Sequence, residues 1–274
     1  MVLFISASLD TLTAGGIGNS VAGWYRAALA GPLSGLRQVE EQGGQVSSIA
    51  CTQRDESSRE LDYSPVSQKW SLMERELSDA PESGDLLFFR GGGDGPTAHV
   101  KNSSITVRHP KMSLSVLLEV GDGEMADPGY CSGITDFLVV SLNGVNPAFA
   151  RVDVTGPWGD GTNLDVVLER RPRYSVDEAR EFLRGYSWIT VCPDELCGRL
   201  GGASGLAASG AFCRVIPLAA GGAVLQATET LSGFSDDAMR DVFRVLAPVL
   251  PAGMPRFDPA HPKVRYVPED ASAM

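Results

Sequence analysis

Residues 187–251 read SWITVCPDEL (187–196), CGRLGGASGLAASGAF (197–212), CRVIPLAAGGAVLQAT (213–228) and then, from Ser235, SDDAMRDVFRVLAPVLP. The first segment predicts an apolar strand and the second a short helical patch. The third predicts a hairpin that turns at Gly221-Gly222, and the fourth predicts an amphipathic helix that begins at Ser235. No Ser, Cys, His or carboxylate here has a spacing that catalysis requires, so the stretch indicates a structural unit.

The rest of the chain shows helical and strand patterns without a regular βαβ repeat. Met1–Leu9 predicts an opening strand, and a helix that starts at Asn19 or Ser20 is interrupted at Gly31-Pro32. Further helices are predicted over 65–78, 176–186 and 236–247. Strands are predicted over 46–51, 85–90, 105–109, 113–120, 137–142, 148–154 and 164–169.

The order of these segments indicates the fold class. The run Phe137–Leu142 begins with four consecutive apolar residues, which is typical of a central strand covered on both faces. Helices among short strands come first, then a run of strands, then a helix, a strand, a hairpin and a helix. This order predicts an α+β fold with a mainly antiparallel sheet, helices packed on it and many loops.

A length of 274 residues is compatible with one large domain or with two domains of ordinary size. The sequence PWGDGT, residues 157–162, is a plausible linker. We therefore expect an N-terminal α+β region over 1–156 and a C-terminal α+β region over 163–251, or a single domain over 1–251. The proline-rich residues 252–274 are expected to form a tail that extends along the surface or frays.

Composition indicates an acidic globular protein. Hydrophobic residues make up 43% of the chain and charged residues 21%, and 34 acidic against 23 basic side chains give a net charge of −11. Nucleic acids and anionic lipids are recognised by Lys and Arg that neutralise phosphates, so we expect neither a nucleic-acid nor a membrane partner. The same acidic surface also serves simple solubility.

The N-terminus and the cysteines indicate a cytoplasmic protein. The sequence MVLFISASLDTLTAGG has no Lys or Arg and only a short apolar run, unlike a secretory signal. No apolar stretch approaches the roughly 18 residues that cross a bilayer. Five scattered cysteines in a chain of this size indicate reduced thiols rather than a disulfide framework.

Motifs for catalysis, metals and cofactors are missing. The glycine run at 15–20 lacks the third glycine of a dinucleotide-binding fingerprint and the lysine of a phosphate-binding loop. Cys192 and Cys197 are separated by four residues rather than the two of a zinc knuckle, so we expect buried thiols. His99 and His109 flank a strand-like segment and could meet a carboxylate. We therefore expect no catalytic residues, no metal and no cofactor.

An acidic segment offers a surface for a partner. Residues 54–62 read RDESSRELD. They are interpreted either as a solvated loop or as a docking surface for a basic partner. The candidate partner-binding residues are Asp55, Glu56, Glu60 and Asp62.

The motif Arg54-Asp-Glu56-Ser57 follows the predicted strand over 46–51 and precedes a predicted helix that carries Trp70. This arrangement resembles immunity proteins of bacterial polymorphic toxin systems, in a family with an Arg-x-Glu-Ser motif. Residues 221–250 are similar to the closing hairpin and helix of such proteins. The likeness covers about a third of the chain, and Thr52-Gln53 stands where that family has a Trp-Gly pair. The resemblance makes Arg54, Glu56 and Ser57 a structural motif, in which Arg54 and Glu56 are expected to pair.

The resemblance implies a non-enzymatic cytoplasmic protein that neutralises a cognate toxin by stoichiometric binding. A net charge of −11 suits a basic toxin, because an acidic surface accelerates capture of a basic partner. Two alternatives stay open. One is an enzyme whose site is built from dispersed Asp, Glu and His residues, and the other is an acidic structural or regulatory subunit.

Overall fold

The computed structural model describes the chain except for residues 11–13, 55–56, 62–65, 80, 92–94, 107–109 and 155–160. The side chains of residues 14–15, 54, 57–61, 66–68, 105–106 and 110 also lie outside the described part. Contacts divide the chain into two compact units. The main unit comprises Met1–Leu9 and Val120–Met274, and the inserted unit comprises Asp10–Glu119. The boundary expected at 157–162 overlaps residues outside the described part, so the expected domains stay a prediction.

The inserted unit is an antiparallel sheet with three helices. Its strands are β2 (Val46–Arg54), β3 (Ser57–Leu61), β4 (Ser83–Arg90), β5 (Ala98–Thr106) and β6 (Pro110–Glu119), in the spatial order β3-β2-β4-β5-β6. Every neighbouring pair among them is antiparallel. Its helices are α1 (Ala14–Ala30), α2 (Ser34–Glu41) and α3 (Val66–Ser78). The predicted interruption at Gly31-Pro32 and the predicted helix over 65–78 are confirmed.

The main unit holds a second set of antiparallel strands. These are β1 (Val2–Leu9), β7 (Phe149–Asp153), β8 (Ile189–Cys192), β9 (Arg214–Pro217) and β10 (Ala223–Gln226), in the spatial order β1-β7-β8-β10-β9. The hairpin predicted at Gly221-Gly222 joins β9 to β10, and both glycines have positive φ angles. With the inserted unit, this arrangement confirms the predicted α+β fold and its mainly antiparallel pairing.

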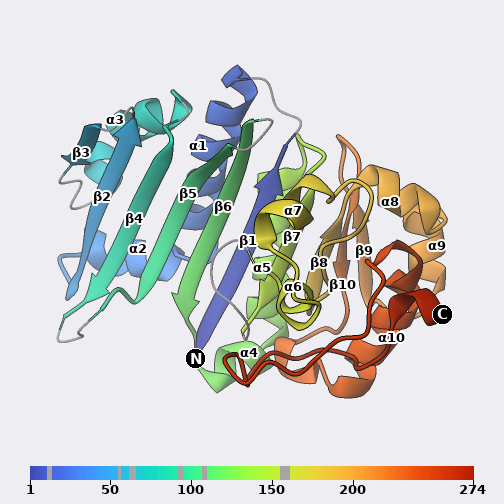
Figure 1. The fold of residues 1–274 in the computed structure, drawn as a ribbon. Coiled ribbons are helices and arrows are strands. Elements are labelled where there is room, and N and C mark those ends of the chain that lie inside the picture. The colour runs from blue at the N-terminus through green and yellow to red at the C-terminus, as the bar shows by residue number, and fades with distance from the viewer. Residues whose placement is uncertain are drawn as a thin grey trace. The chain divides into compact units, whose positions relative to one another are not determined.

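The main unit also contains seven described α-helices. They are α4 (Asp122–Ala126), α5 (Pro128–Leu142), α6 (Asn163–Val167), α7 (Pro172–Asp177), α8 (Asp194–Arg199), α9 (Gly202–Ala208) and α10 (Asp236–Leu246) (Figure 1). The predicted last helix is confirmed as α10. The Ser235 hydroxyl accepts a hydrogen bond from Ala238 N at 3.2 Å, and Asp236 and Asp237 occupy the first turn.

The prediction of a central strand over Phe137–Leu142 is wrong, because these residues belong to helix α5. A short apolar run does not by itself distinguish a buried strand from a largely buried helix. The sequence signal that decides between them lies upstream. Asp127 caps the helix by accepting a hydrogen bond from Gly129 N at 2.9 Å, and Pro128 occupies its first turn.

Two further predictions differ from the structure. The strand predicted over 164–169 is helix α6, which Thr162 and Asp165 start as a capping box. The helix predicted over 176–186 is wrong, since α7 ends at Asp177. Tertiary hydrogen bonds replace helical ones in this segment: Leu183 N donates to Val249 O at 2.7 Å, and Arg184 O accepts from the Thr162 hydroxyl at 2.7 Å.

The strand predicted over 105–109 is placed earlier in the chain, as β5 from Ala98 to Thr106, and residues 107–109 lie outside the described part. Residues 252–274 contain no strand and one short 3-10 helix, Ala271–Ala273, and the expectation of a separate tail stays a prediction. The tail packs along the main unit, where Val267 is buried and its backbone N–H donates to the Tyr186 hydroxyl at 2.8 Å.

Candidate functional site

The acidic residues that the sequence singled out belong to the β2–β3 hairpin and its surroundings. Arg54 ends β2 and pairs with Ser57, the first residue of β3. Glu60 lies on β3 in register with Cys51 of β2. Outside the described part lie residues Asp55, Glu56 and Asp62 and the side chains of Arg54, Ser57 and Glu60. The roles of these residues therefore stay predictions.

All three helices of the inserted unit pack on one face of its sheet. The Tyr25 hydroxyl of α1 donates to Gly84 O at 2.7 Å, and the Ser48 hydroxyl donates to Glu40 of α2 at 2.5 Å. A Cβ atom added to Gly84 would meet Leu77 of α3 at 3.3 Å. Figure 1 shows α1 and α2 behind the strands of this unit. Strand alternation places the side chains of neighbouring residues on the opposite face.

We call that opposite face the uncovered face. It is defined by two rows of residues that are in register across β2, β4, β5 and β6. Cross-strand partners share a face of the sheet. Ile49 is 41% exposed, and the other members are half-buried. The first row consists of Ile49, Leu87, His99 and Leu117, and the second of Cys51, Asp85, Lys101 and Ser115.

The middle of the uncovered face carries a histidine–carboxylate pair. His99 Nε2 lies 2.6 Å from Asp85 Oδ1, and the two side chains are 23% and 28% exposed. The sequence left it open whether His99 meets a carboxylate, and the structure places it against Asp85. Lys101 stands opposite Asp85 on β5. The face therefore combines apolar contact area with groups that donate and accept hydrogen bonds.

The described residues form no metal centre. No group of three or more His, Cys, Asp or Glu side chains in that part of the chain is placed to hold a metal ion. Cys192 and Cys197 are free and buried, as expected. The Cys197 thiol donates to the backbone oxygen of Cys192 at 3.4 Å. The hydrogen bond with Cys197 and burial raise the pKa of the Cys192 thiol, which keeps it protonated.

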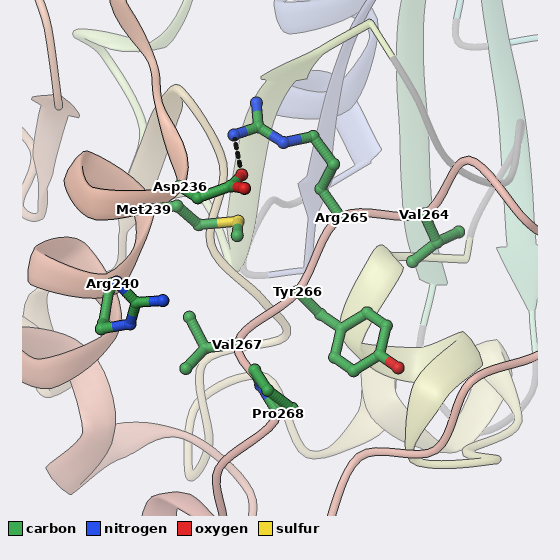
Figure 2. Close-up of a pocket in the computed structure, with 8 residues that line it drawn as sticks. All are labelled: Asp236, Met239, Arg240, Val264, Arg265, Tyr266, Val267 and Pro268. Atoms are coloured by element: carbon green, nitrogen blue, oxygen red, sulfur yellow. Dashed lines mark hydrogen bonds and ion pairs between the residues drawn. The ribbon is translucent and has the colours of Figure 1, made fainter.

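A pocket of about 280 Å³ lies in the main unit where the tail crosses α10. Met239 and Val267 contribute buried apolar surface to it. Figure 2 shows the Arg265 guanidinium turned toward Asp236, to which it donates at 2.7 Å. Arg265 also donates to Phe234 O at 2.9 Å. These contacts hold the tail on α10, so the polar groups of this pocket serve the packing of the tail.

A buried ion pair forms the polar centre of the main unit. Arg184 Nη2 lies 3.3 Å from Asp165 Oδ2, and the two side chains are 3% and 1% exposed. Arg184 also donates to the hydroxyls of Ser8 and Ser175, both at 3.2 Å. Burial lowers the pKa of the neighbouring Arg151 to about 10. The pair ties β1 to α6 and α7, which is a structural role.

Comparison with known proteins adds a fold relationship. No family model matches the chain, and neither does any curated protein. Among solved structures, the chain is similar to the Pseudomonas aeruginosa T6SS protein PA0821, with a TM-score of 0.58. The match covers 91% of this chain and 73% of that one at 12% sequence identity. The likeness therefore shows a common fold.

Sequence reasoning did not identify the uncovered face. Its residues come from four strands between Val46 and Glu119, and only the register of those strands brings them together. One sequence signal was present, because residues 113–116 of β6 read SLSV and alternate polar with apolar residues. Such alternation is typical of a sheet with one packed face.

In the described part of the chain, no helix is long and apolar enough to cross a membrane.

Proposed function

We propose that this protein is a non-enzymatic immunity protein that neutralises a cognate toxin by binding it stoichiometrically. The observation that carries the proposal is the fold that it shares over 91% of its length with a protein described as a T6SS protein. The Arg54-x-Glu56-Ser57 motif and the C-terminal resemblance to immunity proteins point in the same direction. The expected encounter takes place in the cytoplasm.

Charge favours a toxin with a basic surface. The chain carries a net charge of −11, and opposite charges accelerate diffusional encounter and disfavour wrong partners. A nuclease is one class of basic toxin that fits. The four acidic candidates, Asp55, Glu56, Glu60 and Asp62, would contribute to capture of such a partner.

Co-expression with the neighbouring toxin gene tests the proposal. We expect cells that carry the open reading frame immediately upstream to grow only when this protein is also expressed. We also expect the two proteins to purify together in a fixed ratio. A toxic neighbour that neither binds this protein nor is neutralised by it would reject the proposal.

The enzyme alternative rests on one specific observation, the 2.6 Å contact between His99 and Asp85. A carboxylate that orients an imidazole is a recurring element of general acid–base sites. The matched test is the variant His99→Gln, which retains a polar side chain but removes the imidazole. Turnover of a small molecule by the wild type that His99→Gln abolishes would favour an enzyme. Turnover that His99→Gln leaves unchanged would reject a catalytic role for this pair.

A further inference from the structure

We propose that the uncovered face of the inserted unit, defined by Ile49, Cys51, Asp85, Leu87, His99, Lys101, Ser115 and Leu117, is the surface on which the toxin docks. This inference rests on the proposed function and assigns it to one surface. The occupant is a folded protein with a basic surface.

The packing of the sheet leaves one face for a partner. The three helices of the inserted unit contact the side of the sheet that carries Ser48 and Gly84. No described helix of this unit packs on the other side. An antiparallel sheet that faces solvent usually presents polar residues there. This sheet presents polar residues in its second row, but its first row places Ile49, Leu87 and Leu117 beside His99.

The composition of the face fits a binding surface. Protein interfaces combine apolar contact area with hydrogen-bonding groups, and this face has apolar residues at both ends of its first row and the His99–Asp85 pair in its middle. Ile49 is 41% exposed at one end of its row, and Leu87 separates it from His99. The His99–Asp85 pair holds two polar groups in a fixed arrangement, so little side-chain freedom is lost when a partner binds them.

The charge of the unit identifies the kind of partner. The inserted unit carries fourteen Asp and Glu residues against ten Lys and Arg residues. The strand that bears Glu60 pairs with β2, and Cys51 lies in register with Glu60 on one side and Asp85 on the other. The β2–β3 hairpin, which the sequence singled out as acidic, therefore borders the uncovered face. The face itself holds Asp85 opposite Lys101, so the excess of acid belongs to the unit as a whole, where it attracts a basic protein over a longer range.

A pair of matched substitutions tests the surface. Ile49 and Val39 are 41% and 40% exposed, and both belong to the inserted unit. Ile49 lies on the uncovered face, whereas Val39 lies on α2, which packs on the other face. We expect Ile49→Arg to weaken the binding of the co-expressed toxin at least tenfold in a titration. Val39→Arg is expected to change the dissociation constant less than twofold.

A milder variant keeps the test valid if arginine disturbs the strand. Ile49→Thr retains the β-branched shape that suits a strand and removes apolar contact area. We expect it to weaken binding about threefold, and thermal unfolding of each variant shows that the fold is intact. The wild-type chain is run in parallel by size-exclusion chromatography, to measure whether it associates with itself.

Each outcome has a defined meaning. Loss of binding in the Ile49 variants with retained binding in Val39→Arg supports the inference. Equal binding by wild type, Ile49→Arg and Val39→Arg overturns the surface but leaves the proposed function standing. A wild-type protein that binds no toxin contradicts the proposed function itself. A wild-type dimer that Ile49→Arg dissociates overturns the toxin as occupant, because a second copy would then cover the face.

Discussion

At the scale of single residues, Gly222 shows how backbone geometry constrains the sequence. Its φ angle is +84°, and a Cβ atom there would lie 2.6 Å from Cys192 O. Gly210 has a similar φ of +76° but open space around its Cβ position. We expect Gly210→Ala to lower the free energy of unfolding by about 1–2 kcal/mol, the cost of a left-handed residue with a side chain. Gly222→Ala is expected to cost at least about 1 kcal/mol more, because its backbone must also move.

Denaturant titrations of the two glycine variants separate these effects. Both substitutions carry the conformational cost, so their difference reports the clash with Cys192 O alone. Equal denaturation midpoints for Gly210→Ala and Gly222→Ala would contradict this expectation, because the turn between β9 and β10 would then accommodate a side chain without strain.

A second prediction at this scale compares two Asp–Arg pairs of similar geometry. Asp165 and Arg184 are buried and 3.3 Å apart, whereas Asp136 and Arg214 are exposed and 3.2 Å apart. Asp165→Asn removes the charge that compensates buried Arg184 and is expected to destabilise the protein by about 3–5 kcal/mol. Asp136→Asn is expected to cost less than about 1 kcal/mol, because water screens the exposed pair. Similar losses for both, measured by chemical denaturation, would contradict the structural role of the buried pair.

At the scale of elements, α10 is the clearest case in which sequence periodicity predicted the packing. Met239, Val242, Phe243 and Leu246 recur at helical spacing and are all buried. Phe243 is 1% exposed and packs edge-on against Tyr186, with ring centroids 5.7 Å apart. We expect Phe243→Ala to lower the free energy of unfolding by about 3–5 kcal/mol, through lost apolar burial and a residual cavity. The control Val140→Ala, at a position 72% exposed, should stay within about 0.5 kcal/mol of wild type.

The tail provides a pH-dependent prediction. Burial raises the pKa of Tyr186 to about 12, and the hydrogen bond from Val267 N partly opposes this shift. An unfolded tyrosine ionises near pH 10. Because the folded-state pKa is the higher one, the stabilisation is complete below about pH 10 and is lost as the pH rises toward about 12. Over this window we expect the free energy of unfolding to fall by up to about 3 kcal/mol more in wild type than in Tyr186→Phe. If the free energy of unfolding falls equally with pH in wild type and in Tyr186→Phe, the raised pKa of Tyr186 is contradicted.

Elements with caps or clear periodicity were predictable, and elements decided by tertiary contacts were not. The Ser235 cap and the helical spacing of α10 are local signals, as is the glycine pair between β9 and β10. The prediction of a strand over 137–142 was wrong because a short apolar run is compatible with a buried strand and with a buried helix. The prediction of a helix over 176–186 was wrong because the backbones of Leu183 and Arg184 form hydrogen bonds with residues distant in sequence.

The candidate surface was predictable only in part. The acidic residues between Arg54 and Asp62 were visible in the sequence, whereas the pairing of His99 with Asp85 was only one open possibility. The rows that join Ile49 to Leu117 and Cys51 to Ser115 depend on strand register. A shift of register by one residue moves every side chain of a strand to the other face, and no local motif in this chain fixes that choice.

At the scale of the whole molecule, a net charge of −11 predicts how the complex forms. Rim charges act mainly on the association rate, and salt screens them with a Debye length of about 8 Å at physiological ionic strength. We expect the association rate constant with a basic toxin to fall at least about tenfold between low and high salt. Asp55→Asn and Glu60→Gln should lower this rate constant more than they raise the dissociation rate constant. Asp237→Asn, at a side chain 91% exposed on α10, serves as the control with no effect.

If this protein acts by stoichiometric binding, a calorimetric titration of the purified product of the open reading frame immediately upstream with the purified wild-type protein will detect it. Toxin activity is assayed at each point of the titration. We predict saturable binding at a fixed ratio, with toxin activity falling to zero at the same ratio. No heat of binding, together with an active toxin at a tenfold excess of this protein, would contradict it.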